Sequence, residues 1–410
     1  MTTNEQLSKR KDKNIARGIG MQTQIYAEKA QNAEVWDVEG NRYIDFAAGI
    51  AVVNTGHRHP KIVEAIEKQL NQFTHTCHQV MPYENYIVLA ERLNKAVPGN
   101  FDKKTLFATT GAEAVENAIK IARSATGRTA VIAFGGAFHG RTFMGMSLTG
   151  KVVPYKAGFG AMMPDVFHVP FPIEMHNISV EDSISAIEKL FKFDVEASRV
   201  AAIIIEPIQG EGGFYITPKA LIVKLRKLCD EHGILLIADE VQTGFARTGA
   251  LFAMEHFGVA ADITTMAKGL AGGMPLSAVT GKADIMDSVK PGGLGGTYAG
   301  NPLAVASANA VLEIIEEEKL CDRANILGNA LKEKLNQIAK DIPEIVDVRG
   351  LGFMIAVEFN SSDKSQPNPD FANRVRIEAL KQNLILLTCG IYANVIRFLA
   401  PITISDENFA

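Results

Sequence analysis

The chain has 410 residues, of which 47% are hydrophobic and 21% charged, with a formal net charge of −4. This length and composition predict a soluble globular protein with two or more structural units. The charges are spread along the chain, so neither a basic surface for nucleic acid nor an acidic tail is predicted. No apolar signal segment and no apolar run of roughly 18 residues is present, so we expect a cytoplasmic protein that does not span a membrane.

The cysteines and histidines do not predict a metal centre. The four cysteines are far apart and form no CxxC pair, so neither a zinc site nor a disulfide framework is expected. His57 and His59 are close together, but no further candidate ligands lie near them in the sequence. A role in a turn or in packing is therefore favoured for both.

The first element with a chemical signal is a helix that is opened by the sequence TTGAE, residues 109–113. The small residues Gly111 and Ala112 leave backbone N–H groups free to bind an anion such as phosphate. Taken alone, this turn is more often an ordinary helix cap.

The middle of the chain alternates between apolar strands and helices. Strands are predicted over Thr129–Phe134, Val200–Glu206 and Ile234–Ala238, as continuous apolar runs typical of strands buried on both faces of a parallel sheet. Between the last two, a helix is predicted with Thr217 as its N-cap and Gly233 after its end. This βαβ pattern predicts an α/β fold.

The C-terminal third has a different pattern. Residues 302–340 predict two amphipathic helices, and strands within 346–359 and 384–399 predict a smaller α+β unit. The Gly-rich stretch 291–300 is the predicted junction between the two units. It lacks the third glycine of a dinucleotide-binding motif, so a Rossmann site is not supported.

Three predicted strands of the α/β unit are followed by polar residues. Asp239 follows the third strand, Glu206 ends the second, and His139 follows the first. Ligands in open α/β sheets bind at the carboxyl ends of the strands, so these residues are expected to meet. Each signal is weak alone, and Asp239 by itself could equally cap a helix.

Together these stretches resemble one known family. The sequence from Leu235 to Leu276 resembles the signature of the class III (ω-amino-acid) aminotransferases, which use pyridoxal phosphate (PLP). In that signature an aspartate precedes a lysine by 29 residues, as Asp239 precedes Lys268 here. Other stretches resemble the same family in order: VWDVEGNRYIDFAAGIAVVNTGHRHPKI, TTGAEAVENAIKIAR, GAFHGRT, EPIQGEGGFY and GGTYAGNPLA. The resemblance covers nearly the whole chain and is greatest to members that use 4-aminobutyrate (GABA).

The resemblance implies a fold and an assembly. It implies the type I PLP fold, with a large domain of residues 51–299 around a mostly parallel sheet. Residues 1–50 and 300–410 would form the smaller α+β domain, which is expected to be shortened because relatives usually continue with another helix. The active sites would lie at the interface of a homodimer, which could pair further into a dimer of dimers.

The resemblance also implies how PLP is held. Lys268 resembles the lysine that forms a Schiff base with PLP and later carries a proton, and apolar surroundings favour its neutral amine. Asp239 matches the carboxylate that keeps the ring nitrogen protonated. Relatives often have serine at Ala112, so one hydroxyl contact to the phosphate is expected to be missing. The further implied cofactor contacts are the backbone of Gly111 and Ala112 at the phosphate, Phe138 and Val241 at the ring faces, Gln242 near the phenolic oxygen, His139, Glu206, and Thr297 from the partner subunit.

Substrate recognition is implied in the same way. Arg141 resembles the arginine that binds the distal carboxylate of GABA, and Ile50 resembles an apolar wall of GABA enzymes. Arg397 matches the arginine for the α-carboxylate of 2-oxoglutarate. Glu211 matches the glutamate that pairs with Arg397 while GABA reacts, although a static structural salt bridge is an alternative.

The expected reaction is therefore transfer of an amino group from GABA, 5-aminovalerate or β-alanine to 2-oxoglutarate. The alternatives are an ornithine or acetylornithine aminotransferase, or an aminomutase or decarboxylase with the same fold. A binding protein without activity would be expected to have lost Lys268 or Asp239, and both are present.

Overall fold

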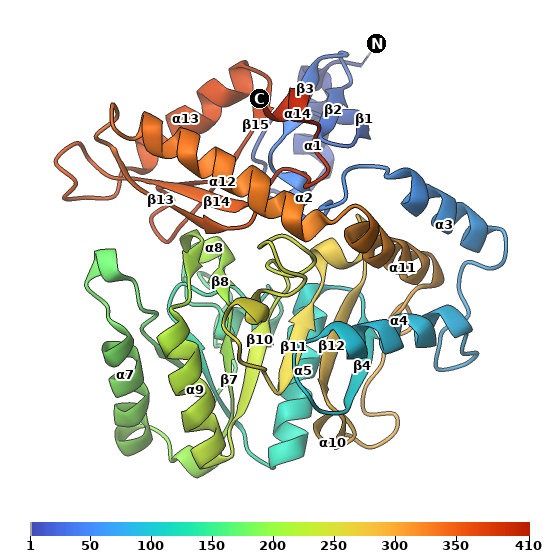
Figure 1. Ribbon diagram of the computed structural model, residues 1–410, viewed down its shortest axis with the longest axis vertical. Helices are drawn as coiled ribbons and strands as arrows, with labels where there is room; N and C mark the ends of the chain where they lie inside the picture. The colour runs from blue at the N-terminus through green and yellow to red at the C-terminus, as the bar shows by residue number, and fades with distance from the viewer. Residues whose placement is uncertain (1) are drawn as a thin grey trace.

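The computed structural model describes residues 2–410. At its centre is a seven-stranded sheet with the strand order β4-β12-β11-β10-β7-β5-β6 (Figure 1). All of these strands are parallel except β12, which is antiparallel to both of its neighbours. The predicted α/β class is confirmed. The strands are Lys103–Ala108 (β4), Ala130–Phe134 (β5), Val166–Val169 (β6), Val200–Ile205 (β7), Leu235–Asp239 (β10), Ile263–Met266 (β11) and Ser277–Lys282 (β12).

The three strands predicted from continuous apolar runs are confirmed as β5, β7 and β10. Their side chains alternate between two buried layers. Ile132 packs in the layer formed with α7 (Val180–Phe193) and α9 (Lys219–His232), whereas Val131 packs in the layer formed with α5 (Gly111–Thr126). Because both faces of the sheet are covered, every position of these strands except the partly buried Leu235 is buried, which explains the runs.

Helix α9 ends as predicted but begins differently. Gly233 follows its last residue in the left-handed conformation, with φ of +62°. At the other end, Pro218 is the N-cap residue, and the Thr217 hydroxyl donates to the backbone oxygen of Glu206 at 3.0 Å. The prediction that Thr217 caps the helix is therefore wrong, because a hydrogen bond to the end of β7 occupies its hydroxyl.

Two smaller sheets lie above the central sheet in the view of Figure 1. One has the order β13-β14-β17-β16 and packs against α12. The other has the order β1-β2-β3-β15, so the N-terminal strands pair with a strand from the C-terminal third. Their members are Ala27–Gln31 (β1), Glu34–Asp37 (β2), Arg42–Asp45 (β3), Ile345–Leu351 (β13), Met354–Phe359 (β14), Leu384–Ile385 (β15), Leu387–Cys389 (β16) and Val395–Phe398 (β17).

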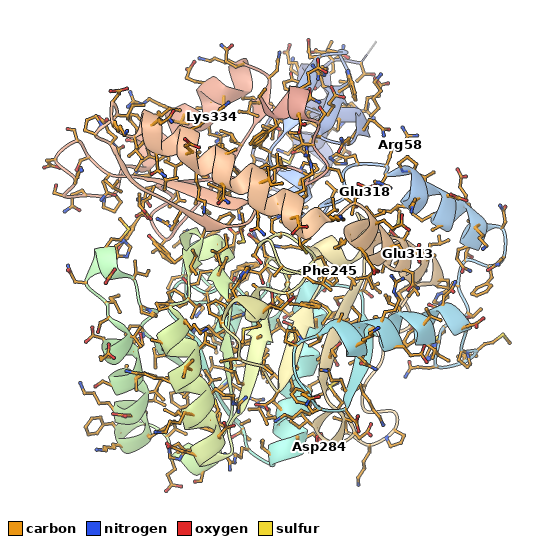
Figure 2. The ribbon with its side chains drawn as sticks, viewed as in Figure 1. Arg58, Phe245, Asp284, Glu313, Glu318 and Lys334 are labelled. Atoms are coloured by element: carbon orange, nitrogen blue, oxygen red, sulfur yellow. The ribbon has the colours of Figure 1, made fainter. Side chains whose placement is uncertain are left out.

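The helices predicted within residues 302–340 are confirmed as α11 (Pro302–Glu317) and α12 (Leu320–Ile338). The division into domains at residues 51 and 299 stays a prediction. One buried cluster contains Phe46, Phe245 and Phe353, so apolar packing is continuous across that division. Figure 2 shows Phe245 near the middle of the molecule, below α12.

The remaining helices surround these sheets. Helices α3 and α4 pack against α11, and Figure 2 shows Glu318 where α3 and α11 meet. There, Glu318 pairs with His59, which also caps α3, and His57 pairs with Asp45. Both histidines thus have structural contacts. These helices are Asn4–Asn14 (α1), Ala48–Ala51 (α2), Pro60–Leu70 (α3), Glu84–Ala96 (α4), Phe143–Leu148 (α6), Gly210–Gly213 (α8), Ala283–Met286 (α10), Pro369–Lys381 (α13) and Asp406–Phe409 (α14).

Two features are absent from residues 2–410. No helix in this range is long and apolar enough to cross a lipid bilayer. No group of three or more His, Cys, Asp or Glu side chains in the same range is arranged to hold a metal ion.

Candidate active site

A cavity of about 570 Å³ lies at the carboxyl ends of β5, β7 and β10. This is the edge of the sheet at which polar residues were expected to meet. Most of the predicted site residues line it: Gly111, Ala112, Phe138, His139, Arg141, Glu206, Glu211, Asp239, Val241, Gln242 and Lys268. Of the other predicted residues, Arg397 contacts Glu211, whereas Ile50 and Thr297 are exposed and are not part of the lining.

Lys268 is the first residue of a 3₁₀ turn that follows β11, and it projects into this cavity. Its backbone is in the left-handed region, with φ of +44°, which costs a non-glycine residue on the order of 1 kcal/mol or more. Burial lowers the pKa of Lys268 to about 8, and the positive charge of Arg397 acts in the same direction against the raising effect of Glu211. The neutral, nucleophilic form of this amine is therefore more populated at neutral pH than it is for an exposed lysine.

Asp239 is held rigidly at the end of β10. It is 4% exposed, and its Oδ1 accepts hydrogen bonds from the Thr265 hydroxyl at 3.0 Å and from the backbone N–H of Val241 at 3.1 Å. Its Oδ2 lies 2.7 Å from Nδ1 of His139. Burial alone would lower the pKa of His139, but the hydrogen bond with Asp239 and its charge raise it above its ordinary value.

Glu206 joins two loops at the floor of the site. Its carboxylate accepts hydrogen bonds from the backbone N–H groups of Phe138 and Gly210, each at 3.0 Å. Burial raises the pKa of Glu206 to about 7, and the charge of Asp239 acts in the same direction against the lowering effect of His139. The residue thus positions the segments that carry Phe138 and Glu211.

The N-terminus of α5 forms another wall of the cavity. Thr110 and Glu113 make a reciprocal capping box, which satisfies the N–H groups at both of these positions. The N–H groups of Gly111 and Ala112 have no hydrogen-bond acceptor within residues 2–410. A Cβ at Gly111 would lie 2.9 Å from a methyl group of Val241, so only glycine fits this close approach.

Glu211 and Arg397, which are 186 residues apart in the sequence, form an ion pair at the site. Nη1 of Arg397 lies 2.5 Å from Oε1 of Glu211, and Oε2 of Glu211 accepts a hydrogen bond from the Tyr155 hydroxyl at 3.3 Å. Burial alone would raise the pKa of Glu211, but the charge of Arg397 lowers it. Both members of this pair are therefore charged.

The comparison with known proteins identifies the family. The family model for class-III aminotransferases matches residues 16–410. The chain belongs to the class-III aminotransferases.

The relatives of this chain match it along almost its full length. It is 56% identical to the 5-aminovalerate aminotransferase DavT of Pseudomonas aeruginosa over 98% of this chain and 95% of that protein. It is 55% identical to the 4-aminobutyrate aminotransferase GabT of Escherichia coli over 99% of this chain and 96% of that protein. A solved ornithine aminotransferase of Toxoplasma gondii, with partial occupancy of PLP at its active site, superposes with a TM-score of 0.88 at 31% identity, covering all of this chain and 92% of that one.

Members of the class-III family use PLP, and the residues of this cavity fit that cofactor. The free N–H groups at the start of α5 suit its phosphate, Asp239 suits its protonated ring nitrogen, and Lys268 suits its aldehyde. Two buried polar atoms of the lining, Nε2 of His139 and Oε1 of Gln242, lack a partner within residues 2–410. A bound polar molecule in the cavity would lie close to both.

The structure also brings residues to the site that the sequence analysis missed. Tyr155 reaches Glu211 from the loop between α6 and β6, Thr265 binds Asp239 from the next strand, and Val52 lines the cavity beside Lys268. No periodic pattern marks Tyr155 or Val52. The pairing of β10 with β11 places Thr265 directly opposite Asp239, so a prediction of this pairing could have found it.

Proposed function

We propose that this chain transfers the amino group of an ω-amino acid, 4-aminobutyrate or 5-aminovalerate, to 2-oxoglutarate by a ping-pong mechanism. With 4-aminobutyrate the products are succinate semialdehyde and L-glutamate. The observation that carries the proposal is the Glu211–Arg397 pair at a cavity that also contains Lys268 and Arg141. The names of the relatives at 55–56% identity include these two ω-amino acids, which supports the choice of substrate.

The cavity residues would divide the chemistry among them. PLP, when bound, supplies an electron sink for negative charge at the amine-bearing carbon of the substrate. Asp239 would keep a proton on the ring nitrogen, and its bonds to Thr265 and Val241 hold the carboxylate in one orientation. Lys268 would attach the cofactor and, once displaced by substrate, would move a proton at the amine-bearing carbon through Nζ, which its lowered pKa permits.

The two arginines would allow one site to bind two substrates that differ in their number of carboxylates. Both 4-aminobutyrate and 2-oxoglutarate carry a distal carboxylate, for which Arg141 is available at the cavity wall. Only 2-oxoglutarate also carries an α-carboxylate, and a buried Arg397 without a partner would be costly in the other half-reaction. Glu211 would neutralise Arg397 while 4-aminobutyrate reacts, and would move aside for a bidentate arginine–carboxylate pair when 2-oxoglutarate binds.

Phe138 and Val241 would cover the two faces of the PLP ring, and Gln242 would approach its phenolic oxygen. Gly111 and Ala112 would bind the phosphate through their backbone N–H groups. His139 and Glu206 would support this arrangement through Asp239 and through the loops of Phe138 and Gly210. Ile50 would form an apolar wall for the substrate. It is 43% exposed in the single chain, with φ of +67°.

A homodimer in the cytoplasm is proposed as the working form, and dimers could pair further. Thr297 lies in an exposed Gly-rich segment away from the cavity lining, and its neighbour Tyr298 is 68% exposed. A second copy could therefore receive Thr297 at its phosphate site. Light scattering of the purified protein tests the assembly, and Thr297→Ala should weaken PLP binding without dissociating the dimer.

A panel of amino donors tests the proposed reaction. The purified enzyme is mixed with 2-oxoglutarate and with 4-aminobutyrate, 5-aminovalerate, β-alanine, ornithine or acetylornithine, and loss of donor and formation of glutamate are followed. We expect turnover with 4-aminobutyrate or 5-aminovalerate and only when 2-oxoglutarate is present. A preference for ornithine or acetylornithine would contradict the proposed substrate. Turnover without 2-oxoglutarate would indicate an aminomutase or a decarboxylase.

A further inference from the structure

Tyr155 contacts two charged residues of the substrate site, Glu211 and Arg141. It is 9% exposed and comes from the loop between α6 and β6, outside the residues that line the cavity. Its hydroxyl donates to Oε2 of Glu211 at 3.3 Å, while Oε1 of the same carboxylate accepts from Arg397. The closed position of Glu211 is thus held by two donors, one on each oxygen.

The ring of Tyr155 has a separate contact. The guanidinium carbon of Arg141 lies 5.0 Å from the ring centroid, within the range of a cation–π interaction. Within residues 2–410, no carboxylate forms a salt bridge with Arg141. The other neighbour of the ring is Phe138, with centroids 4.9 Å apart and planes tilted by 57°. The aromatic face of Tyr155 therefore supports the guanidinium of Arg141.

From these contacts we infer that Tyr155 is a specificity-determining residue that connects the two arginines of the site. Its hydroxyl holds Glu211 in the closed pair with Arg397, and its ring positions Arg141 for the distal carboxylate. This inference rests on the proposed function, in which Arg397 must be neutralised for one substrate and free for the other. Burial, followed by the charge of Glu211, raises the pKa of Tyr155 to about 12, so its hydroxyl remains a donor at neutral pH.

Tyr155→Phe separates the two contacts, because it removes the hydroxyl and keeps the ring beneath Arg141. Glu211 then has one donor fewer in its closed position, so Arg397 is freed more easily. The two half-reactions of the holoenzyme are measured separately in single turnovers with 4-aminobutyrate and with glutamate. The ratio of their rate constants should shift toward glutamate by about threefold to tenfold, which corresponds to the net strength of one hydrogen bond.

The chain offers a matched control at Tyr215. Its hydroxyl donates to Oε2 of Glu358 at 2.7 Å, and the guanidinium carbon of Arg349 lies 3.9 Å from its ring centroid. This tyrosine–glutamate–arginine group repeats the chemistry of Tyr155, but Glu358 and Arg349 do not line the cavity, whereas Glu211 and Arg141 do. Tyr215→Phe should lower the melting temperature and leave the ratio of the two half-reactions unchanged.

Two further measurements distinguish specificity from a structural effect. Tyr155→Phe should produce no further shift of the ratio in a Glu211→Ser background, because the carboxylate it acts on is gone. Calorimetry with the holoenzyme compares glutarate, which has two carboxylates, with butyrate, which has one. Tyr155→Phe should bind glutarate more tightly relative to butyrate than the wild type does.

The outcomes that overturn this inference differ from those that overturn the proposed function. If the wild type uses no ω-amino acid, the proposed function fails. If the wild type does use one, but Tyr155→Phe leaves both the ratio and the relative glutarate affinity unchanged, the role of Tyr155 is wrong. An equal shift with and without Glu211 would also overturn the role, because the effect would then not pass through that carboxylate.

Discussion

Replacing Asp239 with asparagine removes one charge from the site with little change of shape. The Asn oxygen can still accept from the Thr265 hydroxyl and from the N–H of Val241, the two partners of Oδ1. Its amide nitrogen would face Nδ1 of His139, which lies 2.7 Å from Oδ2. Without the charge of Asp239, burial dominates the pKa of His139, so we expect that pKa to fall and the imidazole to become a neutral acceptor.

The loss of activity can be estimated from the contact that asparagine cannot replace. A buried hydrogen bond to a charged group contributes about 1.5–3 kcal/mol. Asp239 would form such a contact with the protonated ring nitrogen of PLP. At 1.36 kcal/mol for each factor of ten, a loss of about 2.7 kcal/mol lowers the rate about a hundredfold. We therefore expect Asp239→Asn to reduce kcat/KM for 4-aminobutyrate by at least about a hundredfold.

The assay follows transamination to 2-oxoglutarate and measures bound PLP by absorbance in the same samples. Thr265→Val is the matched control, because it removes a neutral donor to Asp239 and keeps the charge, and its loss of activity should be smaller than that of Asp239→Asn. An Asp239→Asn enzyme with a wild-type rate and full PLP content would refute the reasoning. Loss of PLP from this variant would instead show that the charge serves binding.

The remaining predictions concern the lysine, the ion pair and pH. Lys268→Ala should abolish transamination while fold and PLP binding largely survive, as circular dichroism and absorbance would show; a variant that keeps wild-type turnover would exclude this role. Glu211→Ser should shift donor preference from 4-aminobutyrate toward glutamate, and Arg397→Ala should weaken the 2-oxoglutarate half-reaction more than the other. Equal slowing of both half-reactions in both variants would mean that the pair is structural. The pKa of Lys268 is about 8 in the folded chain and 10.5 for an ordinary lysine. Between pH 8 and 10.5 the unfolded chain therefore binds more protons at this group than the folded chain does. The free energy of unfolding of the PLP-free protein should consequently increase as pH rises through that range. Lys268→Met should flatten that rise in urea titrations at a series of pH values, and an unchanged slope would contradict the burial of the amine.

Parts of the fold were predictable because local patterns and tertiary burial agree. Strands β5, β7 and β10 are buried on both faces and therefore carry continuous apolar runs. Strand β4 was not predicted, because it begins with Lys103 and Lys104 and only its last two residues are fully buried. The predicted cap at Thr217 failed because its hydroxyl binds Glu206, which lies outside the helix.

The candidate site was predicted chiefly through family resemblance. Strand ends gave Asp239, Glu206 and His139, since parallel strands place their carboxyl ends together. The proximity of Glu211 and Arg397, 186 residues apart, depends on the pairing of β17 with β14 and β16 and has no local signal. Tyr155 was missed for the same reason, because a loop residue is brought to the site only by the finished fold.

The pairing of β3 with β15 has a consequence for synthesis of the chain. Leu384 and Ile385 complete the sheet beside Ile44 and Asp45. The ribosome adds about 340 residues between these strands, which takes about 20–70 s at ordinary rates of elongation. Throughout that interval the edge of β3 is open to pairing with other chains. Nascent chains should therefore be most prone to aggregation, and most dependent on chaperones, before residue 384 leaves the ribosome, whatever the stability of the finished enzyme.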